Sequence, residues 1–166
     1  MPRTVLLNSH QVRQRINRLA WQVFEDQADE KEIVIVGILE SGDAVAKGLC
    51  EALKSISGLS VRHETIRIDK HAQVAGDFKL SADVNSLTGS CVVLVDDVLN
   101  SGKTLFYALR PFLTVEVKKI RTVVLVDRHH RRFPVTADYS GLSLATTLKE
   151  HVSVESDEQG LTAYLD

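Results

Sequence analysis

Two adjacent aspartates directly follow a run of hydrophobic residues. The run covers residues 91–95, and Asp96 and Asp97 come immediately after it. A carboxylate at the end of a buried strand is costly to desolvate unless it has a partner. We therefore expect a cationic or hydroxylated group to lie beside these two side chains.

The small polar turn after the aspartates has the composition of an anion-binding loop. Residues 100–104 read Asn-Ser-Gly-Lys-Thr and stand where a helix is expected to begin. At a helix N-terminus, free backbone N–H groups and the positive end of the helix dipole favour a phosphate. The two acids and the turn together suit a ribose phosphate, with hydroxyl groups at the carboxylates and the phosphate at the turn.

Two competing interpretations of this segment remain to be weighed. In the first, the aspartates only cap the next helix and bind no ligand. In the second, Ser101 to Thr104 form the end of a P-loop, whose first glycine must stand five residues before the second. Because Asp97 occupies that position, the P-loop interpretation fails.

The segment from Val92 to Thr104 resembles the motif with which type I phosphoribosyltransferases bind 5-phosphoribosyl 1-pyrophosphate (PRPP). That motif is a hydrophobic strand, two acids, a few variable residues and then Ser/Thr-Gly-x-Thr. The resemblance implies that Asp96 and Asp97 are catalytic, hold the ribose hydroxyls and contact Mg²⁺ indirectly, through PRPP. The residues implied to bind PRPP are Asp96, Asp97, Val98, Leu99, Asn100, Ser101, Gly102, Lys103 and Thr104.

The resemblance narrows to the pyrimidine-operon regulators that double as uracil phosphoribosyltransferases. It is carried by residues 34–38 with Gly42, by 94–104, by 125–134 and by 137–141. It implies transfer of the phosphoribosyl group from PRPP to a nucleobase, with uracil first, and a homodimer. It also implies that Asp127 and Arg128 belong to the base pocket. The alternatives are an RNA-binding, pyrimidine-responsive regulator with little catalysis, and a purine (hypoxanthine or guanine) phosphoribosyltransferase.

The loop implied to hold pyrophosphate departs from the family pattern. It consists of Leu39, Glu40, Ser41 and Gly42, and family members often carry a basic side chain just before the glycine. A carboxylate aimed at pyrophosphate would be repelled by about 1 to 4 kcal/mol, depending on solvent exposure. We expect Glu40 either to turn outward or to reach Mg²⁺.

Several other polar residues bear on the choice of substrate or partner. Asn100 stands where purine-specific members have a proton-accepting acid, so an amide at this position favours a pyrimidine. Arg67 and Lys70, with Lys79, belong either to a flexible loop that closes over PRPP or to a solvated surface loop. The basic cluster 128–132 is either an RNA patch or an exposed turn. His63, His71 and His151 lack metal-ligand spacing, so we expect them at the surface or in structural roles.

Hydrophobic periodicity predicts the elements that position these residues. Helices are expected at 9–28, 43–55 and 105–113, buried strands at 32–38, 91–95 and 120–126, and an alternating strand at 61–68. The stretch 69–90 is either a mobile loop or a short hairpin, and short strands are expected near 137–144 and 152–154. This order predicts an α/β fold with a doubly wound parallel sheet and a small hood region, in one domain covering residues 1–166. Ligands then sit at the carboxyl ends of the strands.

Composition limits the remaining choices. The 166 residues are 44% hydrophobic and carry 20 basic and 22 acidic side chains. The net charge of -2 argues against a surface built for nucleic acid or anionic membrane. Cys50 and Cys91 are expected as buried free thiols. No run approaches the roughly 20 apolar residues of a membrane span, so we expect a cytoplasmic protein without a membrane partner.

Overall fold

A six-stranded sheet forms the centre of the molecule in the computed structural model, which describes residues 2–69, 77–147 and 149–166. Its strands are β2 (Glu32–Ile38), β3 (Ser60–Ile68), β4 (Phe78–Leu80), β5 (Cys91–Leu99), β6 (Lys119–Asp127) and β7 (Tyr139–Ser143). They lie in the order β4-β3-β2-β5-β6-β7, and every pair is parallel except β3 with β4. The predicted α/β fold with a parallel sheet is confirmed.

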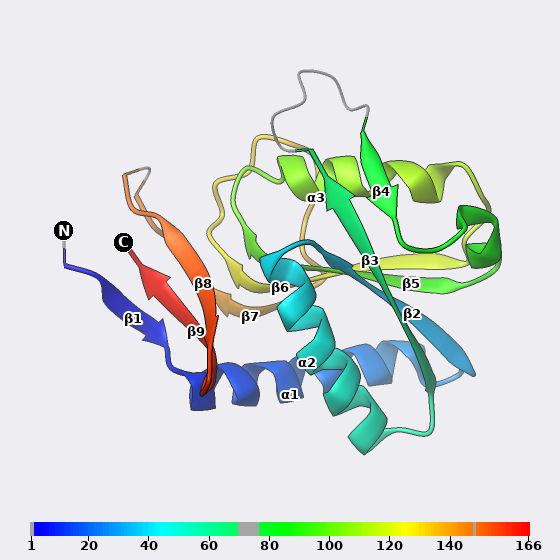
Figure 1. Ribbon diagram of the computed structural model, residues 1–166, viewed down its shortest axis with the longest axis horizontal. Helices are drawn as coiled ribbons and strands as arrows, with labels where there is room; N and C mark the ends of the chain where they lie inside the picture. Colours follow the sequence, from blue (N-terminus) through cyan, green and yellow to red (C-terminus); the bar gives the residue numbers. More distant parts are fainter. Residues whose placement is uncertain (1, 70–76, 148) are drawn as a thin grey trace.

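Helices cover both faces of this sheet (Figure 1). Helices α1 (Ser9–Gln27) and α2 (Ser41–Ile56) pack on one face, and α3 (Lys103–Ala108) lies on the other. Strand β2 is apolar along most of its length because both of its faces pack against a hydrophobic core. Ile33 and Ile35 join the core beneath α1 and α2, while Val34 and Val36 join the core on the α3 side. A strand buried on both faces needs apolar residues at successive positions.

A second, three-stranded antiparallel sheet forms a hood beside the carboxyl ends of the central strands (Figure 1). It consists of β1 (Thr4–Leu7), β8 (Val152–Asp157) and β9 (Gly160–Leu165), with β9 in the middle. Only the start of β8 was predicted. Strands β1 and β9 pair from opposite ends of the chain, with Thr4 opposite Leu165.

Several element boundaries differ from the predicted ones. Strand β5 continues to Leu99, four residues past the predicted end, because Asp96, Val98 and Leu99 still pair with β6. Helix α2 begins at Ser41 rather than Asp43. The predicted helix 105–113 is split: α3 ends at Ala108, and a 3-10 turn, η2 (Arg110–Leu113), follows. Pro111 lacks the N–H that a continuous α-helix would need there.

The polar stretch after Ile68 contains the short hairpin that was one of its two interpretations. Strand β4 pairs antiparallel with β3, and a 3-10 turn, η1 (Val84–Leu87), leads on towards β5. Lys70 and His71 lie outside the described residues.

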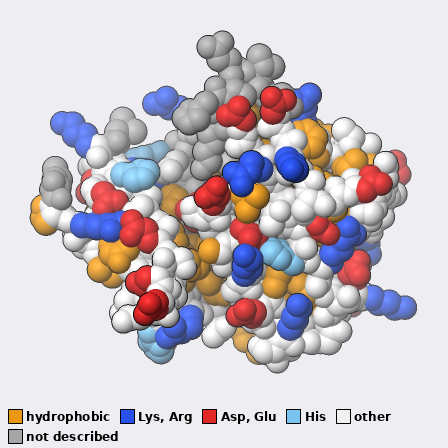
Figure 2. Space-filling model, in the orientation of Figure 1, with side chains coloured by type: hydrophobic (Ala, Val, Ile, Leu, Met, Phe, Trp, Pro, Cys, Tyr) orange, Lys and Arg blue, Asp and Glu red, His pale blue; other side chains and the backbone are white. Residues whose placement is uncertain are grey.

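The positions of the cysteines and of the charged side chains match what the composition led us to expect. Cys50 and Cys91 are buried free thiols, as expected. On the face in Figure 2, acidic and basic side chains are interspersed, in keeping with the near-zero net charge. Within the described ranges, no helix combines the length and apolarity that crossing a membrane would require.

Candidate functional site

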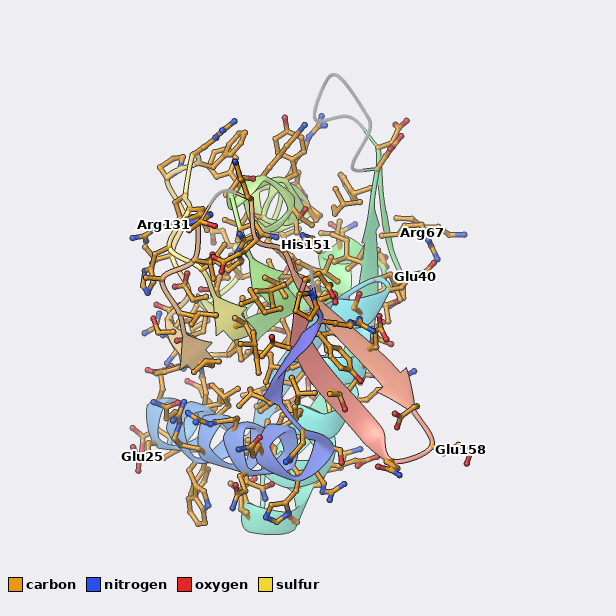
Figure 3. The ribbon with its side chains drawn as sticks, turned by 90° about the vertical axis from the view of Figure 1, so that its left-hand side faces the viewer. Glu25, Glu40, Arg67, Arg131, His151 and Glu158 are labelled. Carbon is orange, nitrogen blue, oxygen red and sulfur yellow. The ribbon has the colours of Figure 1, made fainter. Side chains whose placement is uncertain are left out.

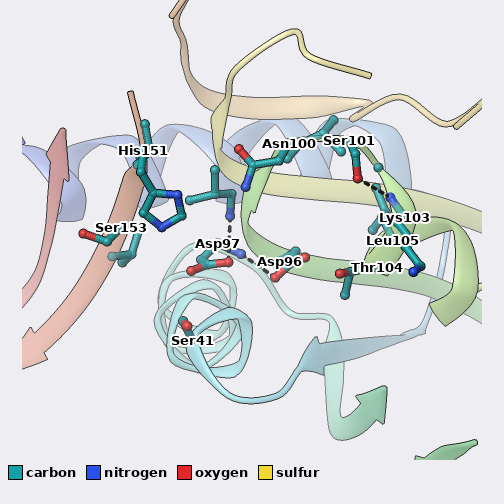
Figure 4. A pocket seen from close by; sticks show the side chains of 15 residues that line it. Ser41, Asp96, Asp97, Asn100, Ser101, Lys103, Thr104, Leu105, His151 and Ser153 are labelled. Carbon is teal, nitrogen blue, oxygen red and sulfur yellow. Dashed lines mark hydrogen bonds between the residues drawn. The ribbon is translucent and has the colours of Figure 1, made fainter. Parts of the chain in front are cut away.

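A cavity of about 260 Å³ opens at the carboxyl end of β5 (Figure 4). Its walls come from β5 and the following turn, from the first residue of α2, and from the start of β8 in the hood. The lining residues are Ser41, Asp96, Asp97, Val98, Leu99, Asn100, Ser101, Gly102, Lys103, Thr104, Leu105, His151, Val152, Ser153 and Val154. The whole predicted segment 96–104 therefore faces one space.

The two aspartates are oriented by backbone N–H groups. Asp96 is buried and Asp97 is half-buried. The N–H of Asp97 donates to Oδ1 of Asp96 at 2.9 Å, and the N–H of Val98 donates to Oδ1 of Asp97 at 2.8 Å. A carboxylate is an acceptor only, so this pair suits a ligand that brings hydroxyl donors.

The turn after the aspartates requires glycine at its centre. Gly102 has a φ of 84°, and a Cβ there would lie 2.7 Å from Cγ1 of Val135. The carbonyl of Ser101 accepts hydrogen bonds from the N–H groups of Arg132 at 2.8 Å and Phe133 at 3.1 Å. The loop is thus held from behind, and the first N–H groups of α3 stand at the cavity wall.

Helix α2 packs directly against the first aspartate. A Cβ on Gly42 would lie 2.8 Å from Oδ1 and 2.9 Å from Cα of Asp96. The absence of a side chain at Gly42 therefore lets the loop 39–42 approach the carboxylates. Sequence reasoning had put these residues in separate loops, and the structure brings them together.

Glu40 turns outward, which is one of the two expected outcomes. Its side chain is 81% exposed, and its Oε1 lies 3.3 Å from Nη1 of Arg67 (Figure 3). Beside it is a second cavity of about 690 Å³, lined by Leu39, Glu40, Ser41, Arg67, Ile68, Asp69, Asp77, Phe78 and Lys79. Ser41 lines both cavities, so Arg67 and Lys79 stand next to the loop 39–42.

Asp127 and Arg128 lie at the end of β6 but line neither of these cavities. Oδ1 of Asp127 accepts a hydrogen bond from the N–H of His129 at 2.9 Å. The Arg128 side chain is buried, and burial lowers the pKa of its guanidinium. It donates to Oδ1 of Asn100 at 2.7 Å and to Oγ1 of Thr146 at 2.9 Å.

Sequence reasoning missed two groups of residues near the site. His151, just before β8, and Ser153, within it, line the cavity; His151 is exposed, as expected, but its place at the cavity was not predicted. Asp43 is buried in the first turn of α2, with Oδ1 2.7 Å from Nε2 of His63 and Oδ2 3.3 Å from Nζ of Lys47. No local pattern marks His151, because its position depends on how the hood strands pair.

Two further features bear on ligands. The described residues contain no group of three or more His, Cys, Asp or Glu side chains that could hold a metal ion by themselves. Arg131 and Arg132 are exposed, and the neighbouring Phe133 ring lies 5.7 Å from the ring of Phe106, which is 40% exposed.

Comparisons with known proteins agree with this geometry. A family model described as the phosphoribosyl transferase domain matches residues 3–159. The chain is 32% identical over 165 residues to a bifunctional protein pyrR of Enterococcus faecalis, covering 96% of this chain and 93% of that one. It is 30% identical over 164 residues to a pyrimidine operon regulatory protein of Lactococcus lactis, covering 95% and 92%.

The fold is also similar to a solved one. A crystal structure of a hypoxanthine-guanine phosphoribosyltransferase from Bacillus anthracis superposes with a TM-score of 0.74 at 23% identity, covering 96% of each chain.

Proposed function

Because the chain belongs to the phosphoribosyl transferase domain family and is a phosphoribosyltransferase, we propose that it transfers the 5-phosphoribosyl group of PRPP to uracil and releases pyrophosphate. The observation that carries the proposal is the single cavity that the twin aspartates share with the glycine turn. In this cavity one continuous segment, residues 96–104, can contact both the hydroxyl groups of the ribose and its 5-phosphate.

PRPP binds along this segment. Asp96 and Asp97 accept hydrogen bonds from the ribose hydroxyls, and the N–H groups at the start of α3 hold the 5-phosphate. The pyrophosphate lies against the loop 39–42, where Ser41 opens into the second cavity. Arg67 and Lys79 supply positive charge on its far side. Lys70 stays a candidate for the same region, outside the described residues.

Mg²⁺ enters with PRPP in this proposal. The cavity offers carboxylate oxygens, which Mg²⁺ prefers, but too few for a cage made by the protein alone. Asp96 and Asp97 would act on such an ion only through the PRPP hydroxyls, and the ion would supply positive charge to the pyrophosphate.

Catalysis is a matter of orientation and electrostatics. The C1–oxygen bond to pyrophosphate breaks, an oxocarbenium-like sugar develops, and a nitrogen of the base attacks the opposite face. Carboxylates beside the ribose and a fixed phosphate anchor hold the sugar for that attack, and such preorganisation supplies several kcal/mol. No covalent enzyme intermediate is required.

The choice of uracil rests on two features. The amide of Asn100 cannot take up a proton as a carboxylate in a purine enzyme can. The Lactococcus lactis relative is named a pyrimidine operon regulatory protein, which supports the same choice.

A substrate screen tests this proposal. Purified protein with PRPP and Mg²⁺ is given uracil, hypoxanthine, guanine, adenine, xanthine or orotate, and nucleotide formation is followed by chromatography. We expect uridine monophosphate as the main product. Product with hypoxanthine or guanine alone would establish the purine alternative instead.

A second candidate function is RNA binding by a pyrimidine-responsive regulator. It is favoured by the Lactococcus lactis relative's name and by the exposed Arg131 and Arg132 beside Phe106 and Phe133. RNA affinity is measured at two salt concentrations, with Arg131→Ala/Arg132→Ala as the variant. Steep salt dependence without nucleotide product would favour the regulator over the enzyme.

A further inference from the structure

When the phosphoribosyl group is transferred to a nucleobase, the base must lose one proton. Few side chains that line the cavity can accept that proton. The nitrogen that bonds to C1 of the ribose gives up its hydrogen during or after the attack. The titratable side chains among the lining residues are Asp96, Asp97, Lys103 and His151. A lysine ammonium has no free lone pair, and the aspartates are committed to backbone N–H groups and to the ribose.

Asn100 is excluded as the acceptor by its partner. The buried guanidinium of Arg128 donates to Oδ1 of Asn100 at 2.7 Å. Because a guanidinium is a donor only, this contact settles which way the amide points. The oxygen is taken up by Arg128, and the NH₂ group faces the cavity (Figure 4). This wall of the cavity therefore offers hydrogen-bond donors to a base.

His151 stands across the cavity from Asn100. Figure 4 shows its imidazole, at the residue just before β8, directed toward Asp97 and Asn100. The ring makes no hydrogen bond within the described part of the chain, so a nitrogen lone pair is available to a ligand. A neutral imidazole carries one such lone pair and can act as a general base towards a proton that it reaches.

The backbone presents this imidazole in a defined place. The N–H of His151 donates to the carbonyl of Asp166 at 3.0 Å, and the N–H of Asp166 donates to the carbonyl of His151 at 2.8 Å. The preceding segment is held by Arg128, which donates to Oγ1 of Thr146 and to the carbonyls of Thr147 and Glu150. One buried arginine thus contacts both Asn100 and the segment that leads to His151.

We propose that His151 is the catalytic residue that accepts the nucleobase proton, and this inference rests on the proposed function. The base N–H bond breaks and its proton goes to an imidazole nitrogen, while the base nitrogen bonds to C1 and pyrophosphate leaves with the electrons of the C1–O bond. The imidazolium then returns the proton to water. The charged groups that face His151 across the cavity are Asp96, Asp97 and Lys103, and its flanking partners are Glu150 and Asp166.

The variant His151→Asn tests this role, with His10→Asn, an exposed histidine on α1, as the matched control. We expect kcat with uracil to fall about 100-fold or more, the range typical of a lost general base, while the KM for PRPP stays within twofold. Added imidazole should restore part of the rate. The acidic limb of the kcat profile, which reports the imidazolium, should disappear in the variant.

A more acidic base sharpens the test. 5-Fluorouracil loses its proton more readily than uracil, so the deficit of His151→Asn should be smaller with it. Equal deficits with both bases, no rescue by imidazole and an unchanged pH profile would overturn the inference.

The two proposals fail differently in this experiment. If the unaltered protein forms no nucleotide from any base, the proposed function fails and the role of His151 with it. If the unaltered protein is active and His151→Asn keeps full activity, only the inference about His151 is wrong.

Discussion

At the residue scale, the site depends on carboxylates whose partners are built into their own strand. Asp96 and Asp97 each accept a hydrogen bond from the next residue's N–H group, so their orientation does not rely on a ligand. Glu40 differs from the two aspartates, because its carboxylate points to solvent and pairs with the side chain of Arg67. From the loop 39–42, Ser41 therefore lines the cavity of the aspartates, while Glu40 lines only the second cavity.

Replacing Asp97 tests the ribose contact. In Asp97→Ala, we expect PRPP with Mg²⁺ to lose its ability to raise the melting temperature, since a hydrogen bond to a charged acceptor contributes about 1.5–3 kcal/mol. That loss corresponds to about 10- to 150-fold weaker binding. Without ligand the variant should melt near the unaltered protein, because Asp97 is only half-buried. Differential scanning fluorimetry with and without PRPP gives both values.

The control for this variant is Glu158→Ala, in the exposed turn between β8 and β9 (Figure 3). Unchanged stabilisation by PRPP in Asp97→Ala would show that the ribose lies elsewhere.

At the element scale, the site is formed where the first turn of α2 packs against Asp96, near the carboxyl end of β5. Gly42, in the first turn of α2, touches Asp96 so closely that no side chain fits between them. Asp43, in the same turn, is anchored to His63 on β3. These two contacts set the distance between the loop 39–42 and the aspartates.

The contact at Gly42 leads to a prediction for Gly42→Ala. A Cβ 2.9 Å from the Cα of Asp96 must push backbone, which we expect to cost about 1–3 kcal/mol of stability and to weaken PRPP binding. Gly48→Ala on the same helix is the matched control, because its Cβ would meet only the end of the Ile16 side chain at 3.1 Å. Urea unfolding and PRPP titration of both variants measure the difference. Equal effects at the two positions would contradict the packing described here.

At the scale of the whole molecule, the core between the central sheet and helices α1 and α2 buries two thiols, Cys50 and Cys91, that resist ionisation. Burial raises the pKa of the Cys50 thiol from 9.0 to about 11, and it also raises the pKa of Cys91. A raised thiol pKa favours the folded state until the unfolded chain begins to ionise. This contribution is complete below about pH 9 and is lost as the pH rises towards about 11.

Alkaline unfolding checks this effect. We expect the melting temperature to fall between pH 9 and 10.5, and to fall less steeply in Cys50→Ala. At pH 8 the thiolate fraction of Cys50 is about 100-fold lower than that of an exposed thiol, so iodoacetamide should label it only after unfolding. Rapid labelling of the folded protein, or identical pH profiles for both proteins, would contradict the burial of this thiol.

Assembly is a separate question at this scale. The homodimer stays a prediction, which light scattering of the purified protein checks.

Neighbouring residues alone were enough to predict the parallel sheet and to single out the segment that we propose to bind PRPP. The apolar run 32–38 and the run ending at Asp96 need only local periodicity to be recognised, and the segment 96–104 is continuous. Even there, local pattern placed the end of β5 too early, since the pairing of Asp96, Val98 and Leu99 with β6 is a contact between distant residues.

Which other side chains reach the cavity depends on contacts between residues far apart in the chain. The hood exists because Thr4 pairs with Leu165, a choice of partner that no local signal encodes, and it is this sheet that carries His151 to the site. In the same way, Arg128 points to Asn100 rather than into the cavity, because its buried guanidinium needs several acceptors at once. Hydrophobic period reports which face of an element is buried, whereas partners across the fold are selected by long-range packing and hydrogen bonding.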